Sequence, residues 1–256
     1  MKVVILAGGL GTRLGEETEH LPKPMVQVGG RPILWHIMKI YGHYGLNDFV
    51  VCLGHKGSVI RDFFQDYRLH ASDITFDMQT GLMEVHQQRT EPWKVTLVDT
   101  GERTQTGGRL KRIARYLDGE SFCLTYGDGL ADIDIPALLR FHTNHRKNAT
   151  VAAVAPPGRF GTLALDGDCV TAMAEKMDTV NTQINGGFFV LEPPVLDLIE
   201  DDDTVWEQAP MKTLAETGHL RAFRHSGFWH PMDTLRDKRY LDSLWMSGKA
   251  QWKLWA

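Results

Sequence analysis

The chain has 256 residues, with 28 Lys and Arg against 32 Asp and Glu, so its formal charge at pH 7 is -4. Hydrophobic residues make up 43% and charged residues 23%, which is typical of a globular protein and excludes a disordered or fibrous one. The acidic balance argues against nucleic acid as a partner, because binding along a phosphate backbone needs a basic face. No apolar run is long enough to cross a membrane, so no membrane partner is expected.

The three cysteines, Cys52, Cys123 and Cys169, lie far apart and have no zinc-binding or redox spacing. They are expected to stay reduced, which indicates a cytoplasmic protein. The apolar start over residues 1–7 stops at Gly8 and Gly9, too soon for the core of a signal peptide.

The first elements predict the class of fold. A β-branched run over residues 3–7 ends in glycines, which is typical of a parallel strand buried on both faces. A helix is expected from Pro32 to about Gly45, then a buried strand over 49–53 and a helix over 59–69. This alternation predicts an α/β fold with a doubly wound, mostly parallel sheet.

The middle of the chain changes character, with short strands expected over 74–78, 83–88 and 94–98. The segment 72–105 is therefore interpreted as a β-rich insertion. Further on, Thr106 is expected to cap a helix. The later expected elements are strands over 122–126, 151–154 and 187–191, a hairpin over 161–173, and helices over 106–117, 135–145, 195–199, 206–217 and 235–246. We predict one domain over 1–256, with 234–256 as a C-terminal helical tail.

The sharpest motif is the sequence LAGGLGTRL at residues 6–14, where three glycines and an arginine follow the first strand. Glycines let the backbone approach a ligand closely, and their N–H groups can form an anion-binding nest. Arg13 could clamp a phosphate with its planar guanidinium. The dinucleotide fingerprint is not met, because Leu14 stands where its third glycine belongs, and the P-loop Lys-Ser/Thr is missing. The motif favours a phosphate site over a plain strand-to-helix turn.

Lys23 lies between Pro22 and Pro24, and the two prolines hold it on stiff, extended backbone. Alone, this pattern is typical of a rigid surface turn with a solvated lysine. Beside the glycine loop, it favours a positioned cation for phosphate.

Together these two motifs resemble the signature of the sugar-1-phosphate nucleotidyltransferases. Five later segments resemble the cytidylyl branch of that family and extend the similarity almost from end to end: 30–38, 91–101, 106–109, 184–189 and 228–234. The resemblance implies a Rossmann-like fold with a small added β-rich subdomain. It implies CTP and glucose 1-phosphate as substrates, with CDP-glucose and pyrophosphate as products. It also implies a homo-oligomer, with a hexamer as one arrangement, and a role in bacterial surface polysaccharide synthesis.

The resemblance also assigns site residues, with Arg13 and Lys23 as catalytic groups. It implies that the nucleotide contacts Leu6, Ala7, Gly8, Gly9, Gly11, Thr12, Arg13, Lys23, Arg109 and Asp128. It implies that the sugar phosphate contacts Tyr126, Glu175, Lys176, Asn185 and Gly186. Met177 departs from the family pattern, which has proline after this lysine, and this puts the role of Lys176 in doubt.

Two aspartates are candidates for a metal site. Asp128 lies between glycines at the expected carboxyl end of a strand, the edge where ligands of open α/β sheets bind. An aspartate between glycines is by itself more typical of a turn. The resemblance implies that Asp128 and Asp233 hold Mg²⁺, the expected cofactor, which takes carboxylate oxygens and substrate phosphates as ligands.

The implied reaction is in-line attack of the sugar phosphate on the α-phosphorus of CTP. The attacking phosphate is largely dianionic at pH 7, so no general base is needed, and positioning and electrostatics would supply the catalysis. The residues alone do not select cytosine. A thymidylyl- or uridylyltransferase of the same family and a nonenzymatic nucleotide-sugar-binding protein therefore both stay open.

Overall fold

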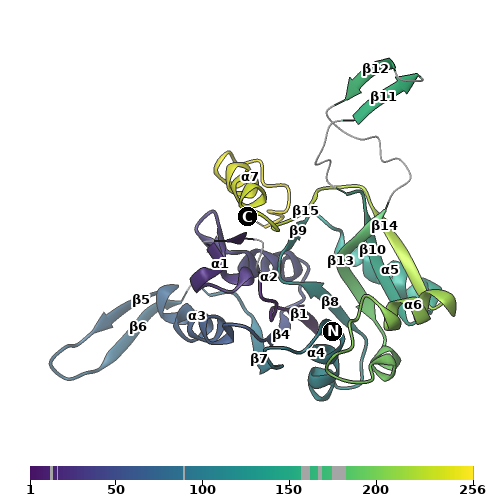
Figure 1. Ribbon diagram of the computed structural model, residues 1–256. Helices are drawn as coiled ribbons and strands as arrows, with labels where there is room; N and C mark the ends of the chain where they lie inside the picture. Colours follow the sequence, from purple (N-terminus) through teal and green to yellow (C-terminus); the bar gives the residue numbers. More distant parts are fainter. Residues whose placement is uncertain are drawn as a thin grey trace.

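The computed structural model describes residues 1–11, 14–15, 17–88, 90–156, 162–166, 169–174 and 183–255. Within these residues, a seven-stranded sheet forms the centre of the molecule (Figure 1). From edge to edge its strands are β14 (Leu220–His225), β10 (Ala149–Val154), β13 (Ile184–Leu191), β8 (Phe122–Tyr126), β1 (Val3–Leu6), β4 (Asp48–Leu53) and β7 (Lys94–Asp99). Every neighbouring pair is parallel except the two pairs made by β13. The predicted mostly parallel α/β sheet is confirmed.

Helices and short strands surround this sheet. The α-helices are α1 (Glu17–His20), α2 (Ile33–His43), α3 (Gly57–His70), α4 (Thr106–Ile113), α5 (Ile135–His145), α6 (Ala209–Glu216) and α7 (Leu235–Met246). The 3-10 helices are η2 (Lys23–Met25), η3 (Ala114–Tyr116) and η4 (Pro193–Leu198). The strands outside the sheet are β2 (Gln27–Val28), β3 (Arg31–Pro32), β5 (Ser72–Phe76), β6 (Met83–Gln88), β9 (Gly129–Ala131), β11 (Thr162–Asp166), β12 (Cys169–Ala174) and β15 (Trp229–Pro231).

Both faces of the sheet are covered, and β1 shows how. Val3 and Ile5 belong to a hydrophobic cluster that includes residues of α2, α3 and α5. Val4 and Leu6, which point the opposite way, belong to a second cluster with residues of α4 and α6. A strand buried on both faces needs the continuous apolar run that its residues have. The fold is therefore doubly wound, as predicted (Figure 1).

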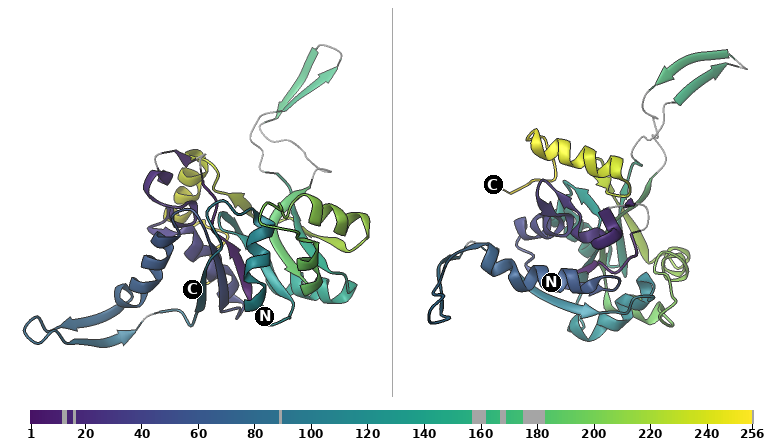
Figure 2. Two further views of the ribbon diagram at one scale, coloured as in Figure 1. Left: turned by 60° about the horizontal axis from the view of Figure 1, so that its bottom comes forward. Right: turned by 60° about the vertical axis from the view of Figure 1, so that its left-hand side comes forward.

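The segment 72–105 contains two kinds of structure. Strands β5 and β6 pair antiparallel in a hairpin that projects from the end of α3, away from the central sheet (Figure 2). Strand β7 instead pairs parallel with β4 and forms an edge of the sheet. In the described part of this segment, only β5 and β6 lie outside the main sheet. The hairpin expected over 161–173 is present as β11 and β12, which pair antiparallel.

Several expected boundaries were wrong. The element expected as a helix over 195–199 is the 3-10 helix η4, which starts at two consecutive prolines that have no N–H to donate. The helix expected from residue 206 begins at Ala209, where Pro210 suits the first turn. Thr106 does not cap α4. The N-cap is Gln105, which donates its N–H to the carbonyl of Asp202, and Gly107 and Gly108 donate theirs to the carbonyl of Thr204.

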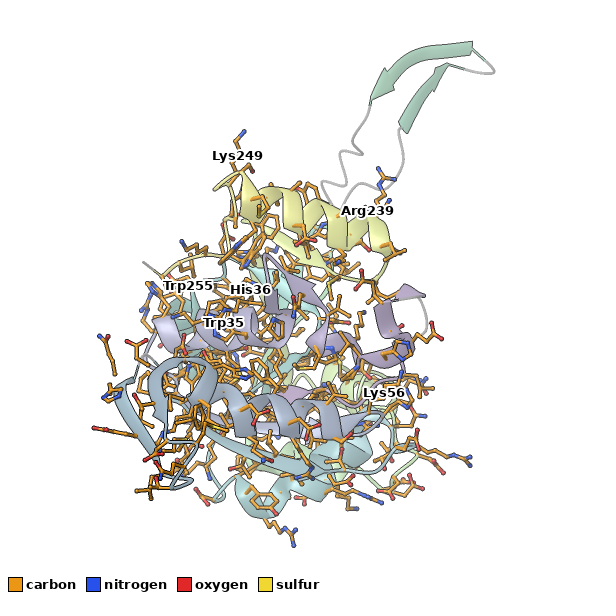
Figure 3. All side chains as sticks on the ribbon, turned by 90° about the vertical axis from the view of Figure 1, so that its left-hand side faces the viewer. Trp35, His36, Lys56, Arg239, Lys249 and Trp255 are labelled. Carbon is orange, nitrogen blue, oxygen red and sulfur yellow. The ribbon has the colours of Figure 1, made fainter. Side chains whose placement is uncertain are left out.

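The tail, described over 234–255, contains α7 and then folds back on the core. Trp252, which is fully buried, donates from Nε1 to Nδ1 of His36 at 3.3 Å. His36 lies on α2, and its Nε2 contacts the carbonyl of Val28 at 2.8 Å. Trp35, His36 and Trp255 gather beneath α7 (Figure 3). Burial lowers the pKa of His36 to about 4, so this histidine is neutral at pH 7 and accepts the tryptophan proton.

In the described part of the chain, no helix is both long and apolar enough to span a lipid bilayer.

Candidate active site

The site lies where β1 and β8 end. These strands are parallel neighbours, so the residues that follow them, Gly8 and Asp128, meet at the carboxyl edge of the sheet. Gly127 donates its N–H to the carbonyl of Leu6 at 3.0 Å. A Cβ on Gly127 would lie 2.8 Å from that same oxygen, so only glycine lets the two chains pass this closely.

Arg109 extends from α4 to the glycine loop and is buried there. Its guanidinium donates to the hydroxyl of Thr100 and to the carbonyls of Gly8, Leu53, Gly101 and Glu102, at 2.7 to 3.3 Å. A Cβ on Gly8 would lie 2.2 Å from Nη1 of Arg109, so the guanidinium packs directly on the loop backbone. Arg109 therefore supports the loop through protein contacts, and its contact with a nucleotide stays a prediction.

Lys23 contacts both candidate metal ligands. The expected extended backbone was wrong: Lys23 begins the 3-10 helix η2, with Pro22 as its N-cap and Pro24 inside it, and this turn aims the lysine at the sheet edge. Its Nζ donates to Oδ2 of Asp128 at 2.6 Å and to Oδ1 of Asp233 at 2.7 Å, and its side chain is 13% exposed. Burial alone would lower the pKa of Lys23, but the charges of Asp128 and Asp233 and the hydrogen bonds to them raise it above the ordinary value. The lysine is therefore a fixed positive charge.

Short strands bring Asp233 beside Asp128, although they are far apart in sequence. Strand β15 pairs antiparallel with β9, and the N–H of Met232 donates to the carbonyl of Asp128 at 2.8 Å. Asp237, at the start of α7, accepts the backbone N–H of Asp233 at 3.1 Å and the Nε2 proton of His230 at 3.0 Å. Because Asp237 also closes a capping box with Thr234, the start of α7 holds Asp233 in place.

The two aspartates fit a divalent cation. Their oxygens already converge on a single ammonium group, so they can also share one metal ion. Within the described ranges, no cluster of three or more His, Cys, Asp or Glu side chains could hold a metal. A two-carboxylate set suits Mg²⁺, which typically completes its coordination with water and substrate phosphates.

Three cavities meet at Asp128. One of about 700 Å³ lies between the glycine loop, Lys23 and residues 102–105. A second, of about 240 Å³, reaches from Leu6 and Ala7 to Thr106 and Tyr126. The third, of about 210 Å³, lies between Tyr126, Gly186 and Trp229, with Asp233 in its wall. The cavity of about 700 Å³ is by itself of the size that small-molecule ligands occupy.

Two of the predicted sugar-phosphate residues, Asn185 and Gly186, lie beside a third, Tyr126. Asn185 donates from Nδ2 to the Tyr126 hydroxyl at 3.0 Å, and its Oδ1 accepts the N–H of Gly187 at 2.8 Å. Gly187 has a φ of 76°, and a Cβ there would lie 2.5 Å from the Tyr126 ring. Trp229 donates from Nε1 to the carbonyl of Gly186 at 2.7 Å. These contacts shape the wall of the third cavity.

The structure thus brings together most of the predicted set. Twelve of the predicted residues line the cavities or form hydrogen bonds to residues that line them. The predicted nucleotide and metal residues among them are Leu6, Ala7, Gly8, Gly9, Gly11, Lys23, Arg109, Asp128 and Asp233. The predicted sugar-phosphate residues among them are Tyr126, Asn185 and Gly186. Four predicted residues, Thr12, Arg13, Glu175 and Lys176, lie outside the described residues.

The sequence interpretation missed several side chains at this site, among them Thr104, Gln105, Glu207 and Asp237. Thr104 and Gln105 line two of the cavities. The Gly107-Gly108 pair that follows them was the available signal, because paired glycines indicate close backbone packing. Glu207 contacts Tyr126, which lies 81 positions away, and no local pattern pointed to it. Asp237 contacts Asp233 four positions before it, and the capping-box spacing of Thr234 and Asp237 was the available signal.

The fold and the site are those of a nucleotidyltransferase, and the chain belongs to this family: the model described as Nucleotidyl transferase matches residues 2–222. The chain is 59% identical over 256 residues to the Glucose-1-phosphate cytidylyltransferase of Salmonella typhi, covering 100% of both chains. It is 43% identical to the Probable glucose-1-phosphate cytidylyltransferase of Bacillus subtilis (strain 168), again over 100% of both. The crystal structure of HddC from Yersinia pseudotuberculosis has the same fold, with a TM-score of 0.69 and 23% identity over 95% of this chain and 99% of that one. The resemblance inferred from the motifs is confirmed.

Proposed function

We propose that this chain transfers a cytidylyl group from CTP to α-D-glucose 1-phosphate and releases CDP-glucose and pyrophosphate. The observation that supports the reaction class is the convergence of Lys23, Asp128 and Asp233 beside the glycine loop. The full-length similarity to the Salmonella typhi cytidylyltransferase supports these two substrates.

The reaction would join two anions, so the residues of the chain must offset charge and fix geometry. The dianionic sugar phosphate attacks the α-phosphorus of CTP without a general base. Lys23 and Arg13 would offset the charge on the departing pyrophosphate, and the backbone of Gly8, Gly9 and Gly11 would receive the nucleotide. Catalysis of this kind comes from positioning and preorganised charge.

The remaining residues would hold the nucleophile and the metal. Lys176 would hold the sugar phosphate, with Asn185 and Tyr126 beside the sugar. Asp128 and Asp233 would hold Mg²⁺, which when bound neutralises and aligns phosphate groups.

Alanine variants of Lys23 and Asp128 test this proposal. Each should lower kcat about 10²–10³-fold, by analogy with the loss of one stabilising group in a preorganised site. Lys94→Ala is the matched control, because this lysine is 74% exposed and pairs at 3.4 Å with Asp48, away from the site. Near-normal turnover in both site variants, with folding intact by circular dichroism, would overturn the proposal.

We also propose that the chain forms a homo-oligomer, with the β5–β6 hairpin as a contact between copies. Four large apolar side chains on this hairpin are exposed: Phe76, Met78, Leu82 and Met83. Exposed apolar clusters are typical of protein interfaces. Light scattering should give a mass of several chains, a hexamer being the arrangement implied by the resemblance, and Met78→Glu with Leu82→Glu should lower it. A monomeric parent chain would contradict this.

A cytoplasmic location is part of the proposal. It suits the buried, unpaired thiols of Cys52 and Cys123.

A further inference from the structure

One carboxylate joins two walls of the candidate site. Oε1 of Glu207 accepts the Tyr126 hydroxyl proton at 2.5 Å, and Oε2 accepts the Thr106 hydroxyl proton at 2.6 Å. Tyr126 ends β8, whereas Thr106 begins α4. Glu207 belongs to neither element and lies in the segment before α6.

Both hydroxyl oxygens already accept another proton. The Tyr126 oxygen accepts from Nδ2 of Asn185 at 3.0 Å, and Oγ1 of Thr106 accepts from the N–H of Trp206 at 2.9 Å. Each hydroxyl must therefore donate its own proton elsewhere. A carboxylate accepts two such protons at once, whereas an amide side chain of the same shape offers one acceptor oxygen.

The two hydroxyl residues share one cavity, and one of them also lines a second. Thr106 lines the cavity that also contains Gly8 and Arg109, on the proposed nucleotide side. Tyr126 lines that cavity too, and it also lines the cavity of Gly186 and Trp229, on the proposed sugar-phosphate side. Tyr126 is thus the partition between the two spaces, and Glu207 fixes it to Thr106.

The backbone around Glu207 is itself held against α4. Gly107 donates its N–H to the carbonyl of Thr204 at 3.0 Å, and a Cβ there would lie 2.6 Å from that oxygen. A Cβ on Gly108 would lie 2.6 Å from Cα of Asp202. The glycine pair therefore lets the segment before Glu207 pack directly on the helix.

We propose that Glu207 is a positioning residue that couples the nucleotide subsite to the sugar-phosphate subsite, by holding Thr106 and Tyr126 with one carboxylate. The inference rests on the proposed function.

Steady-state kinetics of four variants test the coupling. Glu207→Gln keeps the shape but puts an NH₂ donor in place of one acceptor oxygen, so this side chain no longer holds both hydroxyls together, and KM for both CTP and glucose 1-phosphate should rise, each about tenfold. Thr106→Val should raise KM for CTP chiefly, and Tyr126→Phe KM for glucose 1-phosphate chiefly. Glu216→Gln, on the exposed side of α6, is the matched control and should change neither.

Two kinetic results would overturn the proposal. In the first, Glu207→Gln changes neither KM or only one of them. In the second, kcat of the Glu207→Gln variant falls only as far as the fraction of folded protein falls, and both KM values stay normal. That result is expected of a residue with a purely structural role. A parent chain that releases no pyrophosphate from these substrates would instead overturn the proposed function.

Thermal unfolding without substrate tests the hydrogen bonds themselves, whatever the reaction. The double variant Glu207→Ala, Tyr126→Phe should unfold close to Glu207→Ala, because alanine already removes the bond that Tyr126→Phe breaks. The double variant Glu207→Ala, Thr106→Val should likewise unfold close to Glu207→Ala, because alanine already removes the bond that Thr106→Val breaks. Additive decreases in Tm for either pair would contradict the shared carboxylate.

Discussion

A methyl group on Gly8 should displace the buried guanidinium of Arg109. The Cβ of Gly8→Ala would lie 2.2 Å from Nη1 and 2.4 Å from Cζ, so the guanidinium must move by more than an ångström. It cannot do so freely, because five hydrogen bonds hold it to Thr100 and to four carbonyls. Loss of about two of these bonds, each worth roughly 1.5–3 kcal/mol for a charged donor, should lower the free energy of unfolding by about 3 kcal/mol or more.

Thermal unfolding measures this cost, with Gly9→Ala as a matched control. At Gly9 an added Cβ meets no atom within 4 Å, so that substitution should leave Tm within a degree or two of the parent. For a chain of this length, 3 kcal/mol corresponds to a decrease in Tm of about 6–12 °C for Gly8→Ala. Equal Tm values for the two variants would refute the reasoning.

Two further predictions concern stability and metal dependence. His36 has a folded-state pKa of about 4, below the unfolded value of 6.5, so its contribution is complete above pH 6.5 and is lost as pH falls. Measured by urea unfolding, the free energy of unfolding should fall by about 2 kcal/mol between pH 7 and pH 5. The same fall in a His36→Gln variant would contradict this. Asp237→Asn should lower the free energy of unfolding by about 1–2 kcal/mol through the weakened capping box. The same substitution should raise the Mg²⁺ concentration for half-maximal turnover about tenfold, because Asp237 orients Asp233. An unchanged Mg²⁺ requirement would show that Asp237 does not orient Asp233.

Local patterns predicted the elements that are buried or have clear ends. Strands β1, β4 and β8 are apolar runs, and α7 starts at a Thr234 capping box. Strand β14 was missed because it lies at the sheet edge, where Arg221 and Arg224 interrupt the apolar pattern. An edge strand needs no apolar run on its solvent side. Strands β9 and β15 were missed because each has three residues.

The candidate site was predictable only where a motif is continuous in the chain. The glycine loop and the Pro22-Lys23-Pro24 segment carry their chemistry in adjacent residues. The contacts of Arg109 are not visible in the adjacent sequence. Its neighbours Lys111 and Arg112 are exposed, as on an ordinary helix face, but its own guanidinium is buried against the glycine loop. Glu207 contacts Tyr126 across 81 positions, and such a contact follows from topology.

Release of pyrophosphate from CTP, UTP, dTTP, ATP and GTP tests the central claim most directly. Each nucleotide is mixed with glucose 1-phosphate and Mg²⁺, with and without EDTA. We expect release with CTP alone and its loss in EDTA, because Asp128 and Asp233 would then have no metal to hold. Release chiefly with dTTP or UTP would contradict the assignment of cytidylyl transfer, and no release with any nucleotide would contradict the proposed reaction itself.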